Sequence, residues 1–244
     1  MNEKLTIYFT RHGKTDTNAL GLLVGQSGDP RLTEEGIAMA LTLGRRLAHE
    51  GITLDAAYSS PFTRAMDTTA YVLQGMAEAS DSPAAGGAAA ASADILLPDP
   101  ASPSAPLPQI TPIYDLRDTS WGKAEGMTGR EMAETFHITD FRQSFGDIED
   151  PDYVSPMESE NLYQFYHRFD GAVSEILAME KPGRTILVTA HSSMGTWFGK
   201  RFMGSGGAGV DNCSLTKVSY DYGTGEFTLD FFNDRSHFAS KEES

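Results

Sequence analysis

The sequence predicts an α/β fold with a mixed, mostly parallel sheet that helices cover on both faces. Apolar, strand-like runs occur at about 5–10, 54–58, 110–114 and 184–190, and helical patterns lie between most of them. Strands that alternate with helices are typical of a largely parallel sheet. The chain has 244 residues, of which 40% are hydrophobic, enough for a sizeable core. We expect a single domain over residues 1–244.

The end of the chain predicts the antiparallel part of the sheet. Two more strand-like runs, 215–221 and 226–232, flank the Tyr-Gly-Thr-Gly sequence of residues 222–225. A short glycine-containing connection between two such runs is typical of a β-hairpin. The sheet is therefore expected to be mixed.

A first helix is predicted after the Leu-Thr-Glu-Glu-Gly sequence of residues 32–36. Apolar or small residues recur at spacings of three and four from Ile37 to Ala48, which is typical of a helix that lies on a sheet. Thr33 is a suitable N-cap, and the two glutamates after it favour the positive end of the helix dipole.

Residues 78–109 predict an inserted loop of low complexity. This stretch contains an alanine-glycine run and five of the twelve prolines in its second half, so few of its side chains are able to pack. An excursion without function and a segment that docks a partner are both compatible with this composition.

The composition excludes several classes of partner. A net charge of −15 repels nucleic acid and anionic membranes, so an anionic substrate needs a local cluster of cations. No apolar stretch approaches the roughly 20 residues of a membrane span, and the first residues lack the features of a signal peptide. The single cysteine, Cys213, has no partner for a disulfide or a shared metal. We expect a cytoplasmic protein, and the residues leave its oligomeric state open.

Three segments place cationic or imidazole side chains where predicted strands end. Arg11-His12-Gly13 follows the first strand, and His191 follows the strand at 184–190. Ligands of open α/β sheets bind at that edge. Ser60 and Pro61 predict a helix start, because serine caps helices and proline fits the first helical position.

Arg64 then falls in the first turn of that helix. Free amides at a helix start favour an anion, and a guanidinium donates paired hydrogen bonds to phosphate oxygens. Taken alone, Arg64 is equally compatible with a surface ion pair.

A fourth segment brings carboxylates toward the same edge. Asp118 and Glu125 follow the strand at 110–114. Phosphoryl transfer from an ester needs an acid for the leaving alcohol, and a carboxylic acid supplies one. Either residue is also compatible with a solvated loop charge.

These motifs in this order resemble the histidine phosphatase superfamily, the phosphoglycerate mutase-like proteins. The resemblance runs from residue 5 to about 232 and leaves out mainly the insertion at 78–109. It rests on Arg11-His12-Gly13, Asn18, Leu32-Thr33-Glu34-Glu35-Gly36, Ser60-Pro61, Arg64, Leu116-Arg117-Asp118, Gly122, Glu125-Gly126 and His191.

The resemblance implies a three-layer α/β/α sandwich and a pocket for a phosphoryl group. In that pocket His12 attacks phosphorus and forms a phosphohistidine, while Arg11, Arg64 and His191 hold the phosphoryl oxygens. Asn18 falls near the phosphate. The cations supply the charge, so no metal and no cofactor are expected.

The assignment of the general acid stays open between two residues. Asp118 falls where relatives usually carry a glutamate, so its shorter side chain needs compensation from the backbone. Glu125 matches a glutamate-glycine step common in phosphatase branches of the family and is the alternative acid.

Three functions follow from the resemblance. We expect a metal-independent phosphatase that hydrolyses small phosphomonoesters, because the lid expected at about residues 127–166 is rich in acids and carries only single arginines. Such a lid receives a second anionic group poorly. The alternatives are a cofactor-dependent phosphoglycerate mutase and a non-catalytic, phosphate-binding regulatory protein. The expected partner is a small phosphorylated metabolite.

Overall fold

The computed structural model of the protein describes residues 3–81 and 107–238. Its strands are β1 (Lys4–Arg11), β2 (Ala56–Ser59), β3 (Ile110–Pro112), β4 (Thr185–Ala190), β5 (Leu215–Asp221) and β6 (Glu226–Asp234). Its α-helices are α1 (Asp16–Ala19), α2 (Glu34–His49), α3 (Thr63–Asp81), α4 (Gly129–Thr135), α5 (Phe141–Phe145), α6 (Leu162–Met179) and α7 (Met194–Phe198), which continues into a π-helical turn at Gly199–Met203.

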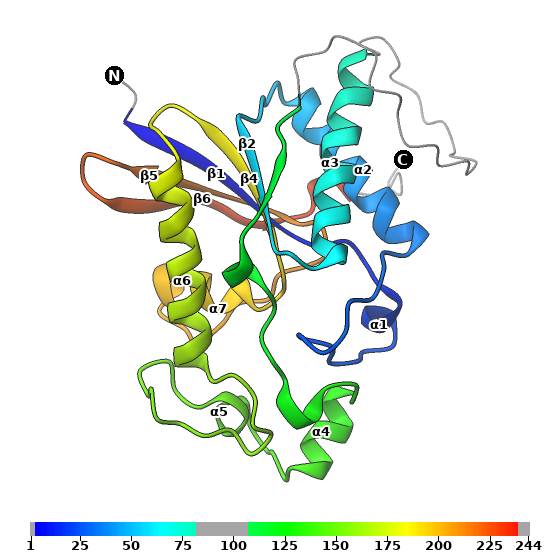
Figure 1. Ribbon diagram of the computed structural model, residues 1–244, viewed down its shortest axis with the longest axis vertical. Coiled ribbons are helices and arrows are strands. Elements are labelled where there is room, and N and C mark those ends of the chain that lie inside the picture. Colours follow the sequence, from blue (N-terminus) through cyan, green and yellow to red (C-terminus); the bar gives the residue numbers. More distant parts are fainter. Residues whose placement is uncertain (1–2, 82–106, 239–244) are drawn as a thin grey trace.

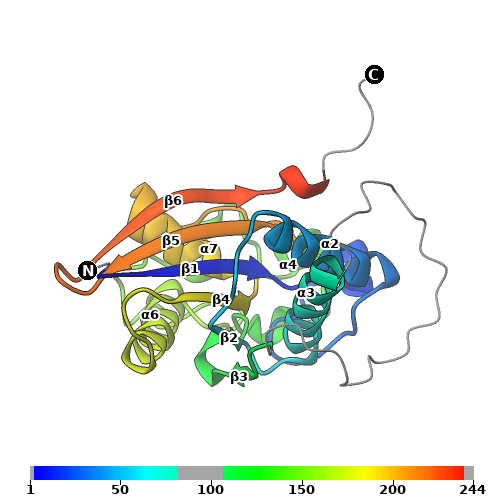
Figure 2. The same ribbon diagram turned by 90° about the horizontal axis from the view of Figure 1, so that it is seen from above.

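The strands form one mixed sheet in the order β3-β2-β4-β1-β5-β6. Three neighbouring pairs are parallel, namely β3 with β2, β2 with β4, and β4 with β1. The strand β5 is antiparallel to both of its neighbours, β1 and β6. The predicted hairpin at residues 215–232 is therefore confirmed, and it forms one edge of the sheet (Figure 2).

Helices cover both faces of this sheet, as the alternating side chains of β1 demonstrate. Leu5, Ile7 and Phe9 belong to the core beneath α6 and α7. Tyr8, between them, belongs to the core beneath α2 and α3. Successive side chains of a strand point to opposite faces. The three-layer α/β/α sandwich is thus confirmed (Figure 1).

Close contact between α2 and α3 depends on two glycines. A Cβ atom at Gly44 would lie 2.0 Å from the carbonyl oxygen of Val72, and one at Gly75 would lie 2.3 Å from that of Leu41. The two helices therefore approach backbone to backbone, side by side in both views (Figures 1 and 2).

The predicted insertion begins later than its composition indicated. Residues 78–81 are the last turn of α3. Glu78 stabilises this turn, because it forms an ion pair with Arg45 of α2 and accepts a hydrogen bond from Gln74. Residues 82–106 lie outside the described residues.

The region expected to form the lid contains α4 and α5 and the start of α6, with a small core of its own around Phe145, Met157 and Leu162. It lies at the lower end of the molecule in Figure 1, beyond the end of the sheet where the segments after the parallel strands meet. Within residues 3–81 and 107–238, no helix is long and apolar enough to cross a membrane.

The glycine contact between α2 and α3 predicts a loss of stability on adding one methyl group. Gly44→Ala should lower the free energy of unfolding by about 1–3 kcal/mol, because the backbones must separate to admit the Cβ. Gly171→Ala is the matched control: this glycine of α6 has open space around its Cβ position, so alanine should stabilise the helix by about 0.5–1 kcal/mol. Urea denaturation measures both, and equal effects would contradict the packing described.

Candidate active site

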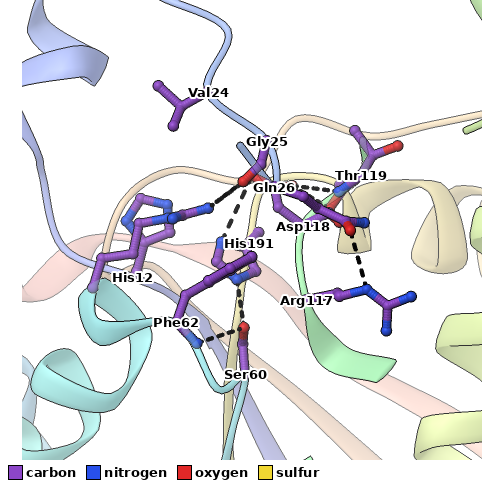
Figure 3. A network of polar contacts seen from close by, with 12 residues as sticks. His12, Val24, Gly25, Gln26, Ser60, Phe62, Arg117, Asp118, Thr119 and His191 are labelled. Carbon is purple, nitrogen blue, oxygen red and sulfur yellow. Dashed lines mark hydrogen bonds and ion pairs between the residues drawn. The ribbon is translucent and has the colours of Figure 1, made fainter. Parts of the chain in front are cut away.

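The parallel strands end at one edge of the sheet and deliver the predicted residues there. His12 follows β1, Ser60 follows β2 and His191 follows β4. Asp118 arrives from the segment after β3. Figure 3 shows these four side chains together, with His191 between Ser60 and Asp118.

His12 is buried and presents one ring nitrogen to the site. Its Nδ1 lies 2.8 Å from the carbonyl oxygen of Gly13. A carbonyl only accepts, so Nδ1 carries the proton and Nε2 keeps a free electron pair. Burial lowers the pKa of His12 well below its ordinary value of 6.5, and the charges of neighbouring His191, Arg11 and Arg64 lower it further. The imidazole is therefore neutral and nucleophilic at neutral pH.

The glycine after this histidine is required by a backbone contact. A Cβ at Gly13 would lie 2.6 Å from the carbonyl oxygen of Gly36, and one at Gly36 would lie 2.2 Å from that of Lys14. Thr33 caps α2 beside this contact by accepting a hydrogen bond from the amide of Gly36, as predicted. The two glycine motifs at residues 11–13 and 32–36 thus belong to one packing contact.

His191 lies beside His12, with ring centroids 5.2 Å apart. Its Nε2 is 2.7 Å from the hydroxyl of Ser60. Its Nδ1 is buried without a hydrogen-bond partner among the described residues, 3.6 Å from Oδ2 of Asp118. Burial lowers the pKa of His191 well below 6.5, and the charges of Arg64 and Arg11 add to this. His191 itself is not among the described residues that line the two cavities of the site.

Arg64 is buried at the start of α3, with 2% of its surface exposed. Its guanidinium donates hydrogen bonds to the carbonyl oxygens of Gly25 and Gly28, at 2.9 and 3.1 Å. It also lies 3.3 Å from a carboxylate oxygen of Asp29 and 3.5 Å from Oδ2 of Asp118. Its position is therefore held from four sides.

The cap of α3 differs from the predicted one. The helix begins at Thr63, and the amides of Thr63 and Arg64 donate to the carboxylate of Asp29 at 2.6 and 3.3 Å. The hydroxyl of Ser60, the predicted cap, accepts only a long hydrogen bond of 3.5 Å from the amide of Phe62, just before the helix, and lies 2.7 Å from His191. A carboxylate is a stronger acceptor for these amides than a hydroxyl.

Arg11 and Asn18 line the same cavity as His12. The guanidinium of Arg11 donates to the carbonyl oxygen of Val210 at 2.9 Å, and its Nε has no partner among the described residues. Asn18 belongs to a capping box with Thr15 at the start of α1. Both residues therefore lie beside His12 at the smaller cavity.

Asp118 is fixed by hydrogen bonds that leave one oxygen facing the histidines. Its Oδ1 accepts from the amide of Thr119 at 3.0 Å and from the hydroxyl of Ser193 at 2.6 Å. Its Oδ2 faces Arg64 and His191. Because the backbone of residues 115–118 is held by Arg168, the shorter aspartate still reaches the site.

Glu125, the alternative acid, is engaged elsewhere. Its carboxylate accepts from the amides of Gln26, Ser27 and Trp121 and from the hydroxyl of Ser27. It is absent from the described residues that line the two cavities of the site. The structure therefore brings Asp118, and not Glu125, to the histidines, because the chain turns between them.

Two adjoining cavities make up the site. The smaller, about 310 Å³, is lined by Arg11, His12, Asn18, Arg64, Asp118, Ser192, Asn212 and neighbouring residues. The larger, about 830 Å³, shares Asp118, Trp121 and Ser192 with it. A small cavity with two guanidinium groups fits a phosphate-sized anion. Within residues 3–81 and 107–238, no group of three or more histidine, cysteine or acidic side chains is arranged for a metal.

Sequence reasoning missed Asn212, Ser193 and Arg168. The amide of the Asn212 side chain donates to the carbonyl oxygen of His12 at 2.7 Å. This asparagine lies in a loop without a recognisable motif. Ser193 stands two residues after His191, and that proximity to a catalytic candidate was the available signal. Arg168 lies on α6, and its pairing with Glu160 at 2.6 Å gave no sign in the sequence.

Comparisons with known proteins agree with this geometry. The family model described as histidine phosphatase superfamily (branch 1) matches residues 7–81 and 102–235, which is most of the chain. A curated 2,3-bisphosphoglycerate-dependent phosphoglycerate mutase of Bradyrhizobium diazoefficiens is 41% identical over 73 residues. That match covers 30% of this chain and 34% of the mutase, so the chain spans about a third of that relative's length.

Solved structures match over nearly the whole chain. YhfR of Bacillus stearothermophilus is 25% identical, with a TM-score of 0.71, over 96% of this chain and 98% of that one. A mycobacterial glucosyl-3-phosphoglycerate phosphatase in complex with VO3 is 20% identical, with a TM-score of 0.68, over 94% and 99%. At 20% identity, the similarity to the mycobacterial phosphatase shows a shared fold and nothing more.

The two buried histidines predict a protein that is less stable in mild acid. In the unfolded chain a histidine takes up a proton near pH 6.5, whereas the folded pKa is lower. Their contribution to stability is therefore complete above pH 6.5 and decreases below it, by up to about 1.4 kcal/mol per pH unit for each histidine. Urea denaturation between about pH 5 and 7 measures this slope. His191→Asn should reduce the slope, and an unchanged slope would contradict the burial described.

Proposed function

Since this chain belongs to the histidine phosphatase superfamily, we propose that it is a phosphatase that hydrolyses small phosphomonoesters through a phosphohistidine on His12. One observation carries the proposal. The neutral imidazole of His12 has its Nδ1 hydrogen-bonded to Gly13, which leaves Nε2 with a free electron pair, and His12 lines a cavity together with Arg11 and Arg64.

The first step transfers the phosphoryl group to the enzyme. Nε2 of His12 attacks phosphorus, and the bond between phosphorus and the ester oxygen breaks. Asp118 donates its proton to that leaving oxygen, so an alcohol departs. Arg11 and Arg64 stabilise the charge on the three remaining oxygens, a role worth about 3–4 kcal/mol for a well-placed donor. Because guanidinium groups supply this charge, the reaction proceeds without a metal.

His191 is the third donor to the phosphoryl group in this mechanism. When the hydroxyl of Ser60 donates to Nε2, the proton of the neutral ring lies on Nδ1. That Nδ1 is the buried atom without a partner among the described residues. It therefore donates a hydrogen bond to a phosphoryl oxygen while the ring stays neutral.

The second step returns the enzyme to its starting state. Asp118, now a carboxylate, takes a proton from a water molecule that attacks phosphorus. The bond between phosphorus and His12 breaks, and inorganic phosphate leaves. Splitting the transfer through a covalent intermediate turns one difficult step into two easier ones.

The proton of Asp118 is assigned to its Oδ2. Two donors, the amide of Thr119 and the hydroxyl of Ser193, already point at Oδ1. A proton on Oδ1 would compete with these two donors, whereas no described residue forms a hydrogen bond to Oδ2, whose nearest donors, on Arg64 and His191, lie at 3.5 and 3.6 Å. Ser193 is therefore a positioning residue for the acid.

The larger cavity favours hydrolysis over a mutase reaction. A phosphoglycerate mutase must hold a second anionic group, whereas Lys200 is the one base among the described residues that line this cavity, and it is paired with Glu149. The mutase remains the second candidate because the curated relatives matched at 41% identity over 73 residues are mutases. A non-catalytic phosphate-binding protein is the third.

The role of His12 as the nucleophile is tested by removing its imidazole. The native chain should hydrolyse p-nitrophenyl phosphate with added EDTA between about pH 4 and 8, and His12→Ala should lose more than about a thousandfold of this rate. Enzyme quenched with alkaline SDS should carry a phosphoryl group that is stable in alkali and lost in acid, which His12→Ala lacks. Release of p-nitrophenol measures the rate.

Two other outcomes would change the assignment. Phosphoglycerate interconversion that depends on a bisphosphoglycerate primer, with little ester hydrolysis, would favour the mutase. Phosphate binding without turnover and without a phosphoenzyme would favour the non-catalytic protein.

The role of Asp118 as the general acid is tested with two kinds of leaving group. Asp118→Asn should slow hydrolysis of alkyl phosphates by about 10²–10⁴-fold, because an alkoxide leaves poorly without a proton. It should slow p-nitrophenyl phosphate much less, since that leaving group needs no proton. Ser193→Ala should repeat this selective loss at smaller size, because the acid loses one of the two hydrogen bonds that position it. Glu125→Gln should not slow alkyl phosphates more than p-nitrophenyl phosphate. If it does, Glu125 and not Asp118 is the general acid.

A further inference from the structure

We propose that the larger cavity is the compartment for the leaving alcohol and that it selects ring-containing, uncharged or cationic alcohols over anionic ones. The inference rests on the proposed phosphatase function and goes beyond it by naming the substrate class. It stands on the cavity's position, its walls and its charges.

The position of the larger cavity follows from the residues that it shares with the smaller one. Asp118, Trp121 and Ser192 line both. An ester whose phosphate lies beside His12 has its bridging oxygen near the acid, and the rest of the molecule then continues into the larger cavity. Its volume of about 830 Å³ suits an organic group much larger than a three-carbon acid.

One wall of the compartment is aromatic and aliphatic. Trp121 and Phe145 meet edge to face with centroids 5.0 Å apart, and Ile148, Leu162 and Phe165 continue this surface. Aromatic rings stack against flat organic groups and stabilise them by more than burial alone. This wall favours a ring in the leaving alcohol.

A second stretch of the lining carries almost no side chains. Residues 204–209 read Gly-Ser-Gly-Gly-Ala-Gly, and all six line the cavity. A Cβ at Gly206 would have Leu162 as its nearest neighbour, at 3.8 Å, which is an ordinary contact. The room in the compartment thus depends on the absence of side chains here.

The charges of the compartment disfavour an anion. Four of the described residues that line it are acids, namely Asp118, Asp147, Glu149 and Glu160, against the single base Lys200. Glu160 is neutralised by Arg168, and Lys200 is paired with Glu149. Asp147 adds a second carboxylate whose charge acts on the same ammonium. A carboxylate or second phosphate on the alcohol therefore meets no free cation, whereas an ammonium meets excess negative charge.

The test compares three substrates that share one ring. They are phenyl phosphates with a 4-methyl, a 4-aminomethyl or a 4-carboxylate group, and the measurement is kcat/KM at low ionic strength. The native chain should prefer the aminomethyl to the carboxylate compound by about tenfold. The double variant Asp147→Asn, Glu149→Gln leaves Lys200 without these carboxylates, so the carboxylate compound should gain about tenfold relative to the native chain.

For each substrate, the kcat/KM of the variant is divided by that of the native chain. This ratio removes the intrinsic reactivity of the substrate from the comparison. Glu175→Gln is the matched control, since this exposed acid of α6 is not among the described residues that line the cavities. It should leave all three ratios near one. Unchanged ratios in the double variant, with the native chain active on all three compounds, would overturn this inference and leave the phosphatase function standing.

A second variant tests the walls and does not depend on the double variant folding. Gly206→Leu should lower kcat/KM for 4-biphenyl phosphate about tenfold more than for phenyl phosphate, because leucine occupies the space of the second ring. An equal loss for both compounds would contradict the proposal that the larger cavity holds the leaving alcohol. Absence of hydrolysis of any ester by the native chain would overturn the proposed function and this inference with it.

Discussion

The buried guanidinium of Arg64 is the constraint on which the arrangement of the site depends. A charge removed from water is costly unless carboxylates and carbonyl groups surround it. Arg64 meets this requirement with Asp29, Asp118 and the carbonyl groups of Gly25 and Gly28. The loop of residues 25–29 is thereby tied to the start of α3, and Asp118 is held beside the smaller cavity. Packing, loop conformation and acid placement therefore follow from one buried ion.

Burial has different effects on the charge of the arginines and of the histidines in the site. Low exposure lowers the pKa of Arg11 as well as that of His12 and His191. A guanidinium starts so far above neutrality that it stays charged, whereas an imidazole that starts near 6.5 becomes neutral. The arginines therefore stay charged at neutral pH, whereas the two histidines are neutral. The positive charge of the arginines itself favours the neutral histidines.

Opposite local charges divide the site within a strongly acidic protein. The chain carries a net charge of −15, yet the small cavity gathers Arg11 and Arg64. The adjoining cavity keeps an acidic rim around Lys200. The two adjoining cavities therefore differ in the sign of the charged side chains that line them.

The sequence by itself determined the alternation of strands and helices, the terminal hairpin, and the positions of Arg11, His12, Arg64 and His191. These follow from local patterns, since parallel strands must end at one edge and a residue after each strand must meet the others there. Only the tertiary structure decided that Asp118 and not Glu125 faces the histidines, because both follow the same strand and the difference lies in how the chain turns between them. It also decided that Asp29 caps α3 and that Ser193 and Asn212 support the site. These contacts join segments distant along the chain, and hydrogen bonds between loops follow no period that a sequence displays.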